Sequence, residues 1–170
     1  MIGLIPGTVK LEAHNSDWQV LFDSEKQNLQ KILKDLPLSI EHIGSTSVEG
    51  LDAKPIIDIA IGVKKLPSYD SLKVLFLWFS EYSIKEDSTP GEVLVRKSSD
   101  TATLFLIHIM EQNSTRYQNT IKFRDILRSH PDIKADYQNL KRSLAKKFSS
   151  DRKKYTASKD AFINDILSKF

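Results

Sequence analysis

Apolar residues recur at helical spacing in two stretches of the first half of the chain. The first covers residues 15–36, where Asn15 or Ser16 can cap a helix and Pro37 ends it. The second covers residues 69–82, and its large apolar side chains suit packing across a sheet: Leu72, Leu75, Phe76, Trp78 and Phe79. The pattern therefore predicts two helices.

Two strand patterns lie between those helices. Residues 38–43 alternate as in a strand with one buried face. The run PIIDIAIGV at residues 55–63 is apolar on both faces and rich in β-branched residues, which is typical of a central strand covered by helices. Asp58 is the single charge in this strand. Its two faces are Ile57, Ile59 and Ile61 on one side and Asp58, Ala60 and Gly62 on the other.

The rest of the chain contains short strands and then helices. Strands are predicted at residues 82–86, 93–97 and 102–110, as an antiparallel meander separated by turn signals. From Asn113 onward the pattern is helical. Two breaks supply new capping residues, at residues 130–132 and 149–151. The expected fold class is α+β, a mixed sheet flanked by helices with a helical C-terminal extension.

Length and composition limit the architecture. A chain of 170 residues can bury one core, so one domain is expected, with an α/β core in about residues 1–112 and helices in about residues 113–170. Apolar residues make up 40% and charged residues 28%, which is ordinary for a globular protein. The absence of cysteine excludes disulfides, thiolate nucleophiles and zinc sites of the Cys type.

The first residues, MIGLIPGTVKLEAHN, lack the basic segment and the uninterrupted apolar run of a signal peptide. The longest apolar runs elsewhere, around residues 56–63 and 74–79, are far too short to cross a bilayer. We therefore expect a cytoplasmic protein without a membrane partner.

Basic residues concentrate in the C-terminal part of the chain. The net charge is +3, but residues 121–160 hold 12 Lys and Arg against 5 Asp. Such a segment can attract a phosphate-bearing ligand, although a solvated helix surface is the simpler alternative for most of these side chains. Arg124, Arg128, Lys141 and Arg152 can reach a site on the sheet, with ion pairing to Asp125, Asp132 or Asp136 as the simpler account. Nucleic acid is not expected as a partner, because the chain lacks exposed aromatics and a recognition-helix signature.

The loop GSTSVEGLDAK has the composition of a phosphate site. Gly44 allows a ligand to approach the backbone closely because it has no Cβ. Ser45, Thr46 and Ser47 add hydroxyl groups, and backbone N–H groups of the loop can donate to phosphate oxygens. Lys54 stands near the end of the same loop and can supply a compensating positive charge. We therefore predict that a nucleotide or another phosphate-bearing small molecule binds here.

Asp58 can hold a divalent metal ion against those phosphates. Mg²⁺ is the natural candidate, since it favours one or two carboxylates together with substrate oxygens and water. In-line phosphoryl chemistry uses such an ion to neutralise charge on the transferred group. The structural alternative is a helix cap or a buried carboxylate satisfied by backbone donors. An unpaired carboxylate inside a buried strand is costly, however, and this favours a functional role.

The stretch EHIGSTSVEGLDAKPIIDIAIGV resembles the signature of the GrpB family, small bacterial proteins of the nucleotidyltransferase superfamily whose pattern is close to HIGSTSVPGLxAKPIIDI. VLVRKSSD, FLIHIME and the long helical region resemble further family segments in the same order, so the similarity covers nearly the whole chain from His42 onward. The resemblance implies a nucleotidyltransferase-like fold. It also implies that Gly44 and Ser45 are the Gly-Ser pair of the superfamily and that Asp58 is its first metal-binding carboxylate.

Five further polar residues match positions of the family: His42, Lys54, Arg96, Lys97 and His108. Arg96 and Lys97 can clasp phosphates from the side opposite the loop. An exposed edge strand protected by charge is the alternative for this pair.

The chain departs from the superfamily at its acidic positions. Active members usually carry a second acid two positions after the first, where this chain has Ala60. A third acid is expected on a later strand, where the alternation offers His108 and Glu111 lies just beyond. One carboxylate with neutral imidazoles would bind Mg²⁺ weakly. Asp58, His42 and His108 can instead form a mixed site that suits Mn²⁺ or Zn²⁺ better, with a satisfied imidazole at the core as the alternative for each histidine.

Two functional hypotheses follow. The first is a metal-dependent nucleotidyltransferase acting on a nucleotide or related phosphate-bearing small molecule, with Asp58, Ser45 and His108 as catalytic residues and Mg²⁺ or Mn²⁺ as cofactor. The second is a catalytically degraded nucleotide-binding or assembly module of the same fold, which Ala60 favours. Family members are also fused to dephospho-coenzyme A kinase, so the resemblance implies a link to coenzyme A metabolism.

Overall fold

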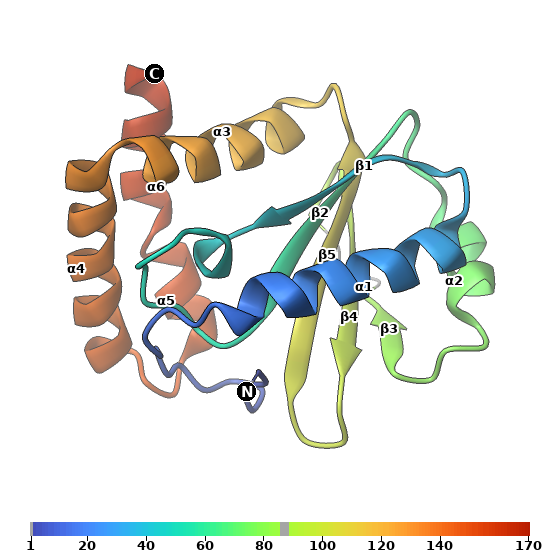
Figure 1. Cartoon of the computed structure of the whole chain (residues 1–170), viewed down its shortest axis with the longest axis horizontal. Coiled ribbons are helices and arrows are strands. Elements are labelled where there is room, and N and C mark those ends of the chain that lie inside the picture. The colour runs from blue at the N-terminus through green and yellow to red at the C-terminus, as the bar shows by residue number, and fades with distance from the viewer. Residues whose placement is uncertain (1, 86–88) are drawn as a thin grey trace.

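The structure is a computed structural model that describes residues 2–85 and 89–170. At the centre of these residues lies a five-stranded sheet of order β1-β2-β5-β4-β3 (Figure 1). The strands are β1 (Pro37–Ile43), β2 (Ile57–Val63), β3 (Tyr82–Ile84), β4 (Glu92–Ser98) and β5 (Thr103–Glu111). β2 and β5 run parallel and every other neighbouring pair is antiparallel. The sheet is therefore mixed, and the fold class expected from the sequence is confirmed.

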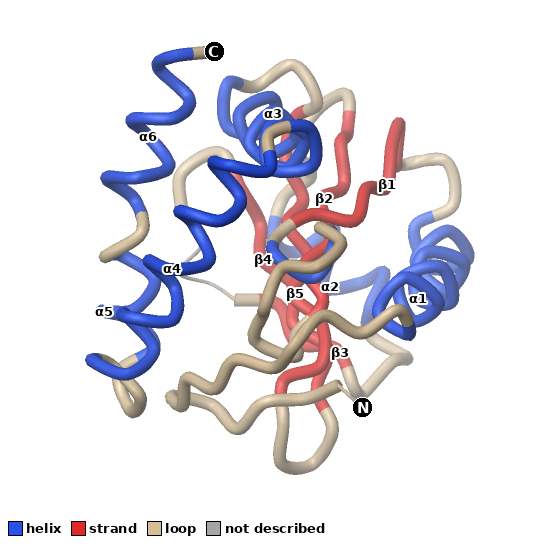
Figure 2. The backbone as a smooth tube through the Cα atoms, turned by 60° about the vertical axis from the view of Figure 1, so that its left-hand side comes forward, coloured by secondary structure: helices blue, strands red, loops and turns tan. Residues whose placement is uncertain are grey.

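Helices cover both faces of this sheet. They are α1 (Asp17–Leu33), α2 (Tyr69–Phe76), α3 (Thr115–Ser129), α4 (Pro131–Lys147), α5 (Arg152–Ala157) and α6 (Asp160–Lys169). α1 and α2 pack on one face, whereas α3 packs on the other. α4, α5 and α6 stand together on the α3 side of the molecule, away from α1 (Figure 2). No helix of the described residues combines the length and the apolar character that a membrane span needs.

The main core lies between the sheet and the pair α1 and α2. It joins alternate residues of β2 and β5 to the apolar side of α1: Ile57, Ile59, Ile61, Ile107, Ile109, Trp18, Phe22 and Leu29. The three isoleucines of β2 are fully buried. Burial of each such side chain stabilises the fold by roughly 1.5–3 kcal/mol. Because strand residues alternate, Asp58 is turned to the opposite face, towards α3 and the C-terminal helices.

A smaller apolar cluster joins the loop after β1 to the C-terminal helices. Val48 and Leu51 of this loop pack with Leu127 of α3 and Tyr137 of α4. All four side chains are buried. The cluster fixes the helical part of the chain against the same loop that carries Gly44, so the two halves of the site are held together by packing.

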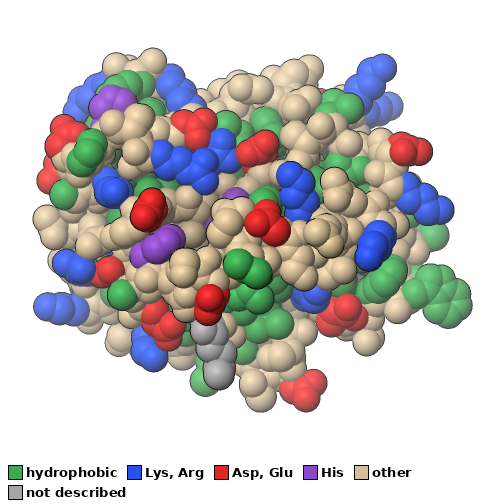
Figure 3. Space-filling view, in the orientation of Figure 1, with side chains coloured by type: hydrophobic (Ala, Val, Ile, Leu, Met, Phe, Trp, Pro, Cys, Tyr) green, Lys and Arg blue, Asp and Glu red, His purple; other side chains and the backbone are tan. Residues whose placement is uncertain are grey.

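The helix predicted over residues 69–82 is wrong in its second half. α2 ends at Phe76, and turn hydrogen bonds from Phe79 N to Phe76 O and from Tyr82 N to Phe79 O lead the chain into β3. The apolar run beyond the helix stays at the surface, where Trp78 is 87% exposed. Apolar atoms accordingly protrude at the α2 end of the molecule, at the right-hand edge of Figure 3. Glu86, the end of the strand predicted at residues 82–86, lies outside the described residues.

The helix breaks are where the sequence predicts them, with one addition. Asp151 caps α5 by accepting a hydrogen bond from Lys154 N, whereas His130 makes no side-chain cap at the start of α4. A further break at Ser158 and Lys159 separates α5 from α6. This unpredicted break matters for the site, because Lys159 lies on it.

Candidate functional site

The turn after β1 brings Gly44 against Asp58. Ile43 pairs with Asp58 across the antiparallel β1–β2 ladder, so the next residue passes directly beside the carboxylate. Gly44 has φ +67° and ψ −173°, a conformation that is essentially restricted to glycine. An ideal Cβ at this position would lie 2.5 Å from Asp58 Oδ2. The strand thus supplies the acid, and the glycine leaves room for it.

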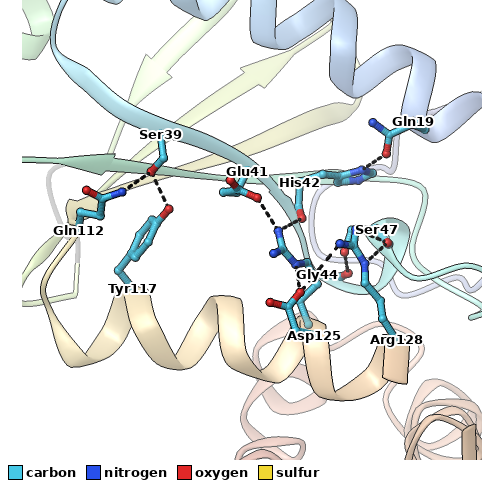
Figure 4. A network of polar contacts seen from close by, with 11 residues as sticks. Gln19, Ser39, Glu41, His42, Gly44, Ser47, Gln112, Tyr117, Asp125 and Arg128 are labelled. Carbon is cyan, nitrogen blue, oxygen red and sulfur yellow. Dashed lines mark hydrogen bonds and ion pairs between the residues drawn. The ribbon is translucent and has the colours of Figure 1, made fainter. Parts of the chain in front are cut away.

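Side chains of α3 hold this turn in place. The turn continues into a short 3-10 helix, η1 (Ser45–Ser47), in which Ser47 Oγ donates to Gly44 O at 2.7 Å. Arg128 donates to Ser47 O through Nε at 3.1 Å and Nη2 at 2.8 Å. Arg124 donates to His42 O at 3.1 Å. Figure 4 shows this network between α3 and the end of β1. The loop geometry therefore depends on the helical part of the chain.

A cavity of about 690 Å³ opens between the Asp58 face of the sheet and the helices α3 to α6. Gly44, Ser45, Thr46 and Asp58 line it from the sheet side. The side chain of Asp58 is 30% exposed, so the carboxylate reaches the cavity. This volume lies in the range of small-molecule sites, which are usually lined by apolar side chains with a few convergent polar groups.

Asp58 belongs to a chain of charged groups across the sheet. His108 Nε2 of β5 lies 3.8 Å from Asp58 Oδ1, an ion-pair contact that is too long for a hydrogen bond. Its Nδ1 donates to Glu92 Oε1 of β4 at 2.5 Å, and Arg116 Nε donates to the other oxygen of Glu92 at 2.9 Å. Burial opposes a charged imidazole, but the carboxylates of Asp58 and Glu92 outweigh it and raise the pKa of His108 to about 9. His108 is thus a cation at neutral pH and faces the charge of Asp58.

The cavity is lined by many more cations than carboxylates. Among the described residues, the lining has one carboxylate, Asp58. Its basic side chains are Lys54, His108, Arg116, Arg124, Lys141, Arg152 and Lys159. Arg116 and Arg124 are paired with carboxylates of β4 and β1. Lys54, Arg152 and Lys159 have no carboxylate within ion-pair distance among the residues that the structure describes. The cavity therefore carries uncompensated positive charge.

The lysines of the cavity are less basic than free lysine. Burial lowers the pKa of Lys54 to about 8, although the nearby charge of Asp58 opposes this shift. Burial also lowers the pKa of Lys141 to about 7, and it lowers the pKa of Lys159. Each shift has the same main cause, which is that burial removes water from the ammonium group and disfavours its charged form. A bound anion would favour the charged form.

The side chains around Asp58 do not form a metal centre by themselves. Within residues 2–85 and 89–170, no group of three His, Cys, Asp or Glu side chains is arranged to hold a metal ion. Ala60 shares the face of Asp58 and is fully buried in an apolar cluster. His108 already directs its ring nitrogens at Asp58 and Glu92. One carboxylate beside an imidazolium does not provide the several oxygen ligands of a resident Mg²⁺ site.

Six of the predicted site residues line the cavity, namely Gly44, Ser45, Thr46, Lys54, Asp58 and His108. Ser47 does not, but it holds Gly44 O. His42 faces α1, where it stacks on Phe22 with ring centroids 4.8 Å apart, and its Nε2 lies 3.0 Å from Thr46 Oγ1. Burial lowers the pKa of His42 to about 4. The structure therefore places this imidazole behind the loop and does not bring it into a mixed metal site with Asp58.

Arg96 and Lys97 are separated by the sheet. Lys97 lies on the α1 face, where its Nζ is 2.6 Å from Glu25 Oε2 and Tyr82 donates to the other oxygen of Glu25 at 2.5 Å. Arg96 shares the face of its register partner Leu106, a cavity residue, but does not line the cavity itself. Its Nε is buried and has no hydrogen-bond partner in the part of the chain that the structure describes. Neighbours on a strand point to opposite faces, so the two residues cannot clasp one phosphate together.

Several residues of the site were not predicted from the sequence. Glu92, Arg116, Tyr155 and Lys159 reach the site from segments whose position relative to Asp58 is set only by tertiary packing. The excess of basic residues between positions 121 and 160 is the one signal that pointed to the cations of the C-terminal helices. Arg152 is among those cations and lines the cavity.

The arrangement of sheet, helices and Gly-Ser turn defines a nucleotidyltransferase-like fold. The crystal structure of the Cid1 poly(U) polymerase with MgGTP bound has a TM-score of 0.52, at 17% identity over 79% of this chain and 44% of that chain. At this identity the likeness shows the fold alone.

The chain belongs to the GrpB family: the family model described as GrpB protein matches residues 8–169. The glutamate-rich protein GrpB of Alkalihalophilus pseudofirmus is 33% identical over 172 residues, which cover 99% of both chains. The crystal structure of the conserved protein GrpB from Enterococcus faecalis has a TM-score of 0.82 at 33% identity and covers 94% of this chain and 96% of that chain. A dephospho-CoA kinase of Mycolicibacterium paratuberculosis is 24% identical over 181 residues, 92% of this chain but 44% of that protein. The family expected from the sequence motif is confirmed.

Proposed function

We propose that the cavity binds a nucleotide or a related phosphate-bearing small molecule, with the phosphates held by the cavity cations and by the turn at Gly44 and Ser45. The observation that carries the proposal is the charge imbalance of the lining. Uncompensated cations surround a single carboxylate, Asp58, which His108 already faces. Hydrogen bonds between such cations and phosphate oxygens are about twice as strong as those between neutral groups.

Metal-dependent nucleotidyl transfer is the second candidate. It is supported by the position of Asp58 beside the Gly44 turn and by the likeness of the fold to a polymerase crystallised with MgGTP. In this case Asp58 would hold Mg²⁺ or Mn²⁺ together with the phosphates of the nucleotide, and the ion would neutralise charge on the transferred group. Two features disfavour this candidate: Ala60 stands where a second carboxylate would be needed, and His108 is a cation beside Asp58. Binding without a metal is therefore the favoured function.

The two candidates differ in the expected role of Asp58. If the cations hold the phosphates, then Asp58 repels them, and Asp58→Asn should leave binding intact or strengthen it. If Asp58 holds a metal ion between itself and the phosphates, then Asp58→Asn should abolish the effect of the metal. The substitution keeps the shape of the side chain, so it tests the charge alone.

Calorimetric titration with ATP, AMP and dephospho-coenzyme A, each in EDTA and in MgCl₂, tests the proposal. The relative named dephospho-CoA kinase is the reason for including the third ligand. We expect binding of a phosphate ligand in EDTA, to both the wild-type protein and Asp58→Asn. Binding that needs MgCl₂ and disappears in Asp58→Asn would favour the transferase instead. The absence of binding to the wild-type protein under either condition would refute both.

A further inference from the structure

Lys54 and Lys159 meet at the ring of Tyr155. Lys54 comes from the loop before β2, and Lys159 from the junction of α5 and α6. Their Nζ atoms lie 5.4 Å and 5.0 Å from the centroid of the Tyr155 ring, which is buried. Two ammonium groups that are distant in sequence are thus fixed around one aromatic ring. The ring face attracts each cation, but it does not cancel their charge.

Arg152 adds a third cation to this group. It lies three positions before Tyr155 on α5, so the two side chains share one side of the helix. Its Nε donates to Thr8 O at 3.2 Å and its Nη2 donates to Ile5 O at 3.0 Å. These carbonyls hold the guanidinium in place but carry no net charge. Arg152 therefore keeps its positive charge while losing its freedom to move.

Lys54, Arg152 and Lys159 are named here the Tyr155 cation group. The charges of Lys159 and Arg152 both make protonation of Lys54 less favourable. Asp58 attracts all three members, but it is a single carboxylate that already faces His108. Asp160 also attracts Lys159, so two carboxylates act on three fixed cations, and the group remains short of negative charge. Such an arrangement is expected where an anionic ligand supplies the remaining negative charge.

The Tyr155 cation group adjoins the Gly44 turn through Asp58. Gly44 is in contact with the Asp58 carboxylate on one side, and the three cations lie within electrostatic reach of the same carboxylate. Gly44 and all three cations line one cavity. A ligand with one anionic group at the Gly44 turn would therefore place an adjacent anionic group at the Tyr155 cation group.

We infer that the Tyr155 cation group is a second anion subsite, which makes the site selective for ligands with at least two adjacent anionic groups, such as a nucleoside diphosphate or triphosphate. This inference rests on the proposed function and specifies its class of ligand. It assigns the recognition of the outer phosphates to Lys54, Arg152 and Lys159, and the recognition of the inner phosphate to the turn at Gly44.

Titration calorimetry in EDTA with ATP and AMP as probes tests the inference. The wild-type protein should bind ATP at least about tenfold more tightly than AMP, since each charge-assisted hydrogen bond is worth roughly such a factor. Lys159→Gln should weaken ATP binding about tenfold and leave AMP binding within about twofold. Lys54→Gln should act in the same way. The affinities for inorganic triphosphate and inorganic phosphate repeat the comparison without the nucleoside.

Lys153→Gln is the matched control. Lys153 is also on α5, but its side chain is exposed and does not line the cavity. Its substitution should change neither affinity, and circular dichroism should show that all variants keep the fold. Equal binding of ATP and AMP, or an equal loss of both in Lys159→Gln, would overturn the second subsite while nucleotide binding stands. If the wild-type protein binds neither ligand, the proposed function itself fails.

Discussion

Gly44 and Asp58 leave no space for a side chain between them. A Cβ on Gly44 would lie 2.5 Å from Asp58 Oδ2 and 3.1 Å from Asp58 Cβ. The glycine of the Gly-Ser motif is therefore required by the protein's own carboxylate, independently of any ligand. Glycine at this position does two things. Its missing Cβ leaves room for the Asp58 carboxylate, and it also leaves the backbone accessible from the cavity.

Gly44→Ala should destabilise the fold and displace the carboxylate. The variant combines backbone strain at φ +67° with a collision, which together should lower the free energy of unfolding by about 2–4 kcal/mol. Gly91→Ala is the control, since Gly91 has φ +81° but no atom within 4 Å of its ideal Cβ. It should lose only about 1–2 kcal/mol through strain. Equal losses in urea unfolding would show that the contact with Asp58 is not tight.

The sequence predicts the local part of the site well. The alternation in β2 places Asp58 opposite the buried isoleucines, because the period of a strand is a property of neighbouring residues. The Gly44 turn is equally local, since it joins two strands that pair directly. The same alternation also separates Arg96 from Lys97, and the prediction that they act as a pair overlooked it.

Local patterns do not reveal the partners of Asp58, and only the family resemblance pointed to His108. His108 comes beside it only through the parallel register of β2 and β5, in which Ala60 is opposite His108. Lys159 comes within electrostatic reach of it through the packing of the C-terminal helices on the loop that carries Gly44. Both relationships depend on contacts between segments far apart in sequence, and no local pattern encodes them.

His108→Gln should remove one stabilising contribution that is lost at alkaline pH. Burial opposes the imidazolium, but Asp58 and Glu92 raise the pKa of His108 from 6.5 to about 9. Because the pKa is higher in the folded chain, the contribution is fully present below pH 6.5 and is lost as the pH rises through about 9. The stability advantage of the wild-type protein over His108→Gln should therefore shrink by on the order of 2 kcal/mol over this window. Urea unfolding of both proteins in EDTA measures this difference. His130→Gln, a control at the junction of α3 and α4, should show the same pH dependence as the wild-type protein.

His42 should govern the acid side of the same profile. Burial lowers the pKa of His42 from 6.5 to about 4. Its contribution is therefore present above pH 6.5 and is lost as the pH falls towards 4, because the unfolded chain takes up the proton first. His42→Gln should be less stable at neutral pH by about 1 kcal/mol, since it loses the ring stacked on Phe22. The variant should lose less stability than the wild-type protein between pH 6.5 and 5. An unchanged acid slope would contradict this role.

Lys97→Met should affect stability and leave ligand binding unchanged. Lys97 pairs with Glu25, whose side chain is 2% exposed, on the sheet face opposite the cavity. Removal of the cation leaves a buried carboxylate without its partner, which should cost about 3–5 kcal/mol. Glu25→Gln in the same chain should recover part of this loss. A weaker affinity for ATP in a folded Lys97→Met variant would contradict the assignment of Lys97 to the structural face.

Ala60→Asp tests whether one residue separates this site from a metal site. Ala60 is fully buried on the Asp58 face, next to the ladder position of His108. A carboxylate there should cost about 3–5 kcal/mol in EDTA, because it would be buried in the apolar cluster of Ile43, Met110 and Tyr117. In MgCl₂ the variant should regain part of its stability, since two carboxylates on one strand face can share the ion, while the wild-type protein should not respond. Ala60→Asn, which has the same size without the charge, should lose stability in both buffers. If MgCl₂ stabilises the wild-type protein as much as Ala60→Asp, then Asp58 alone suffices to hold the ion.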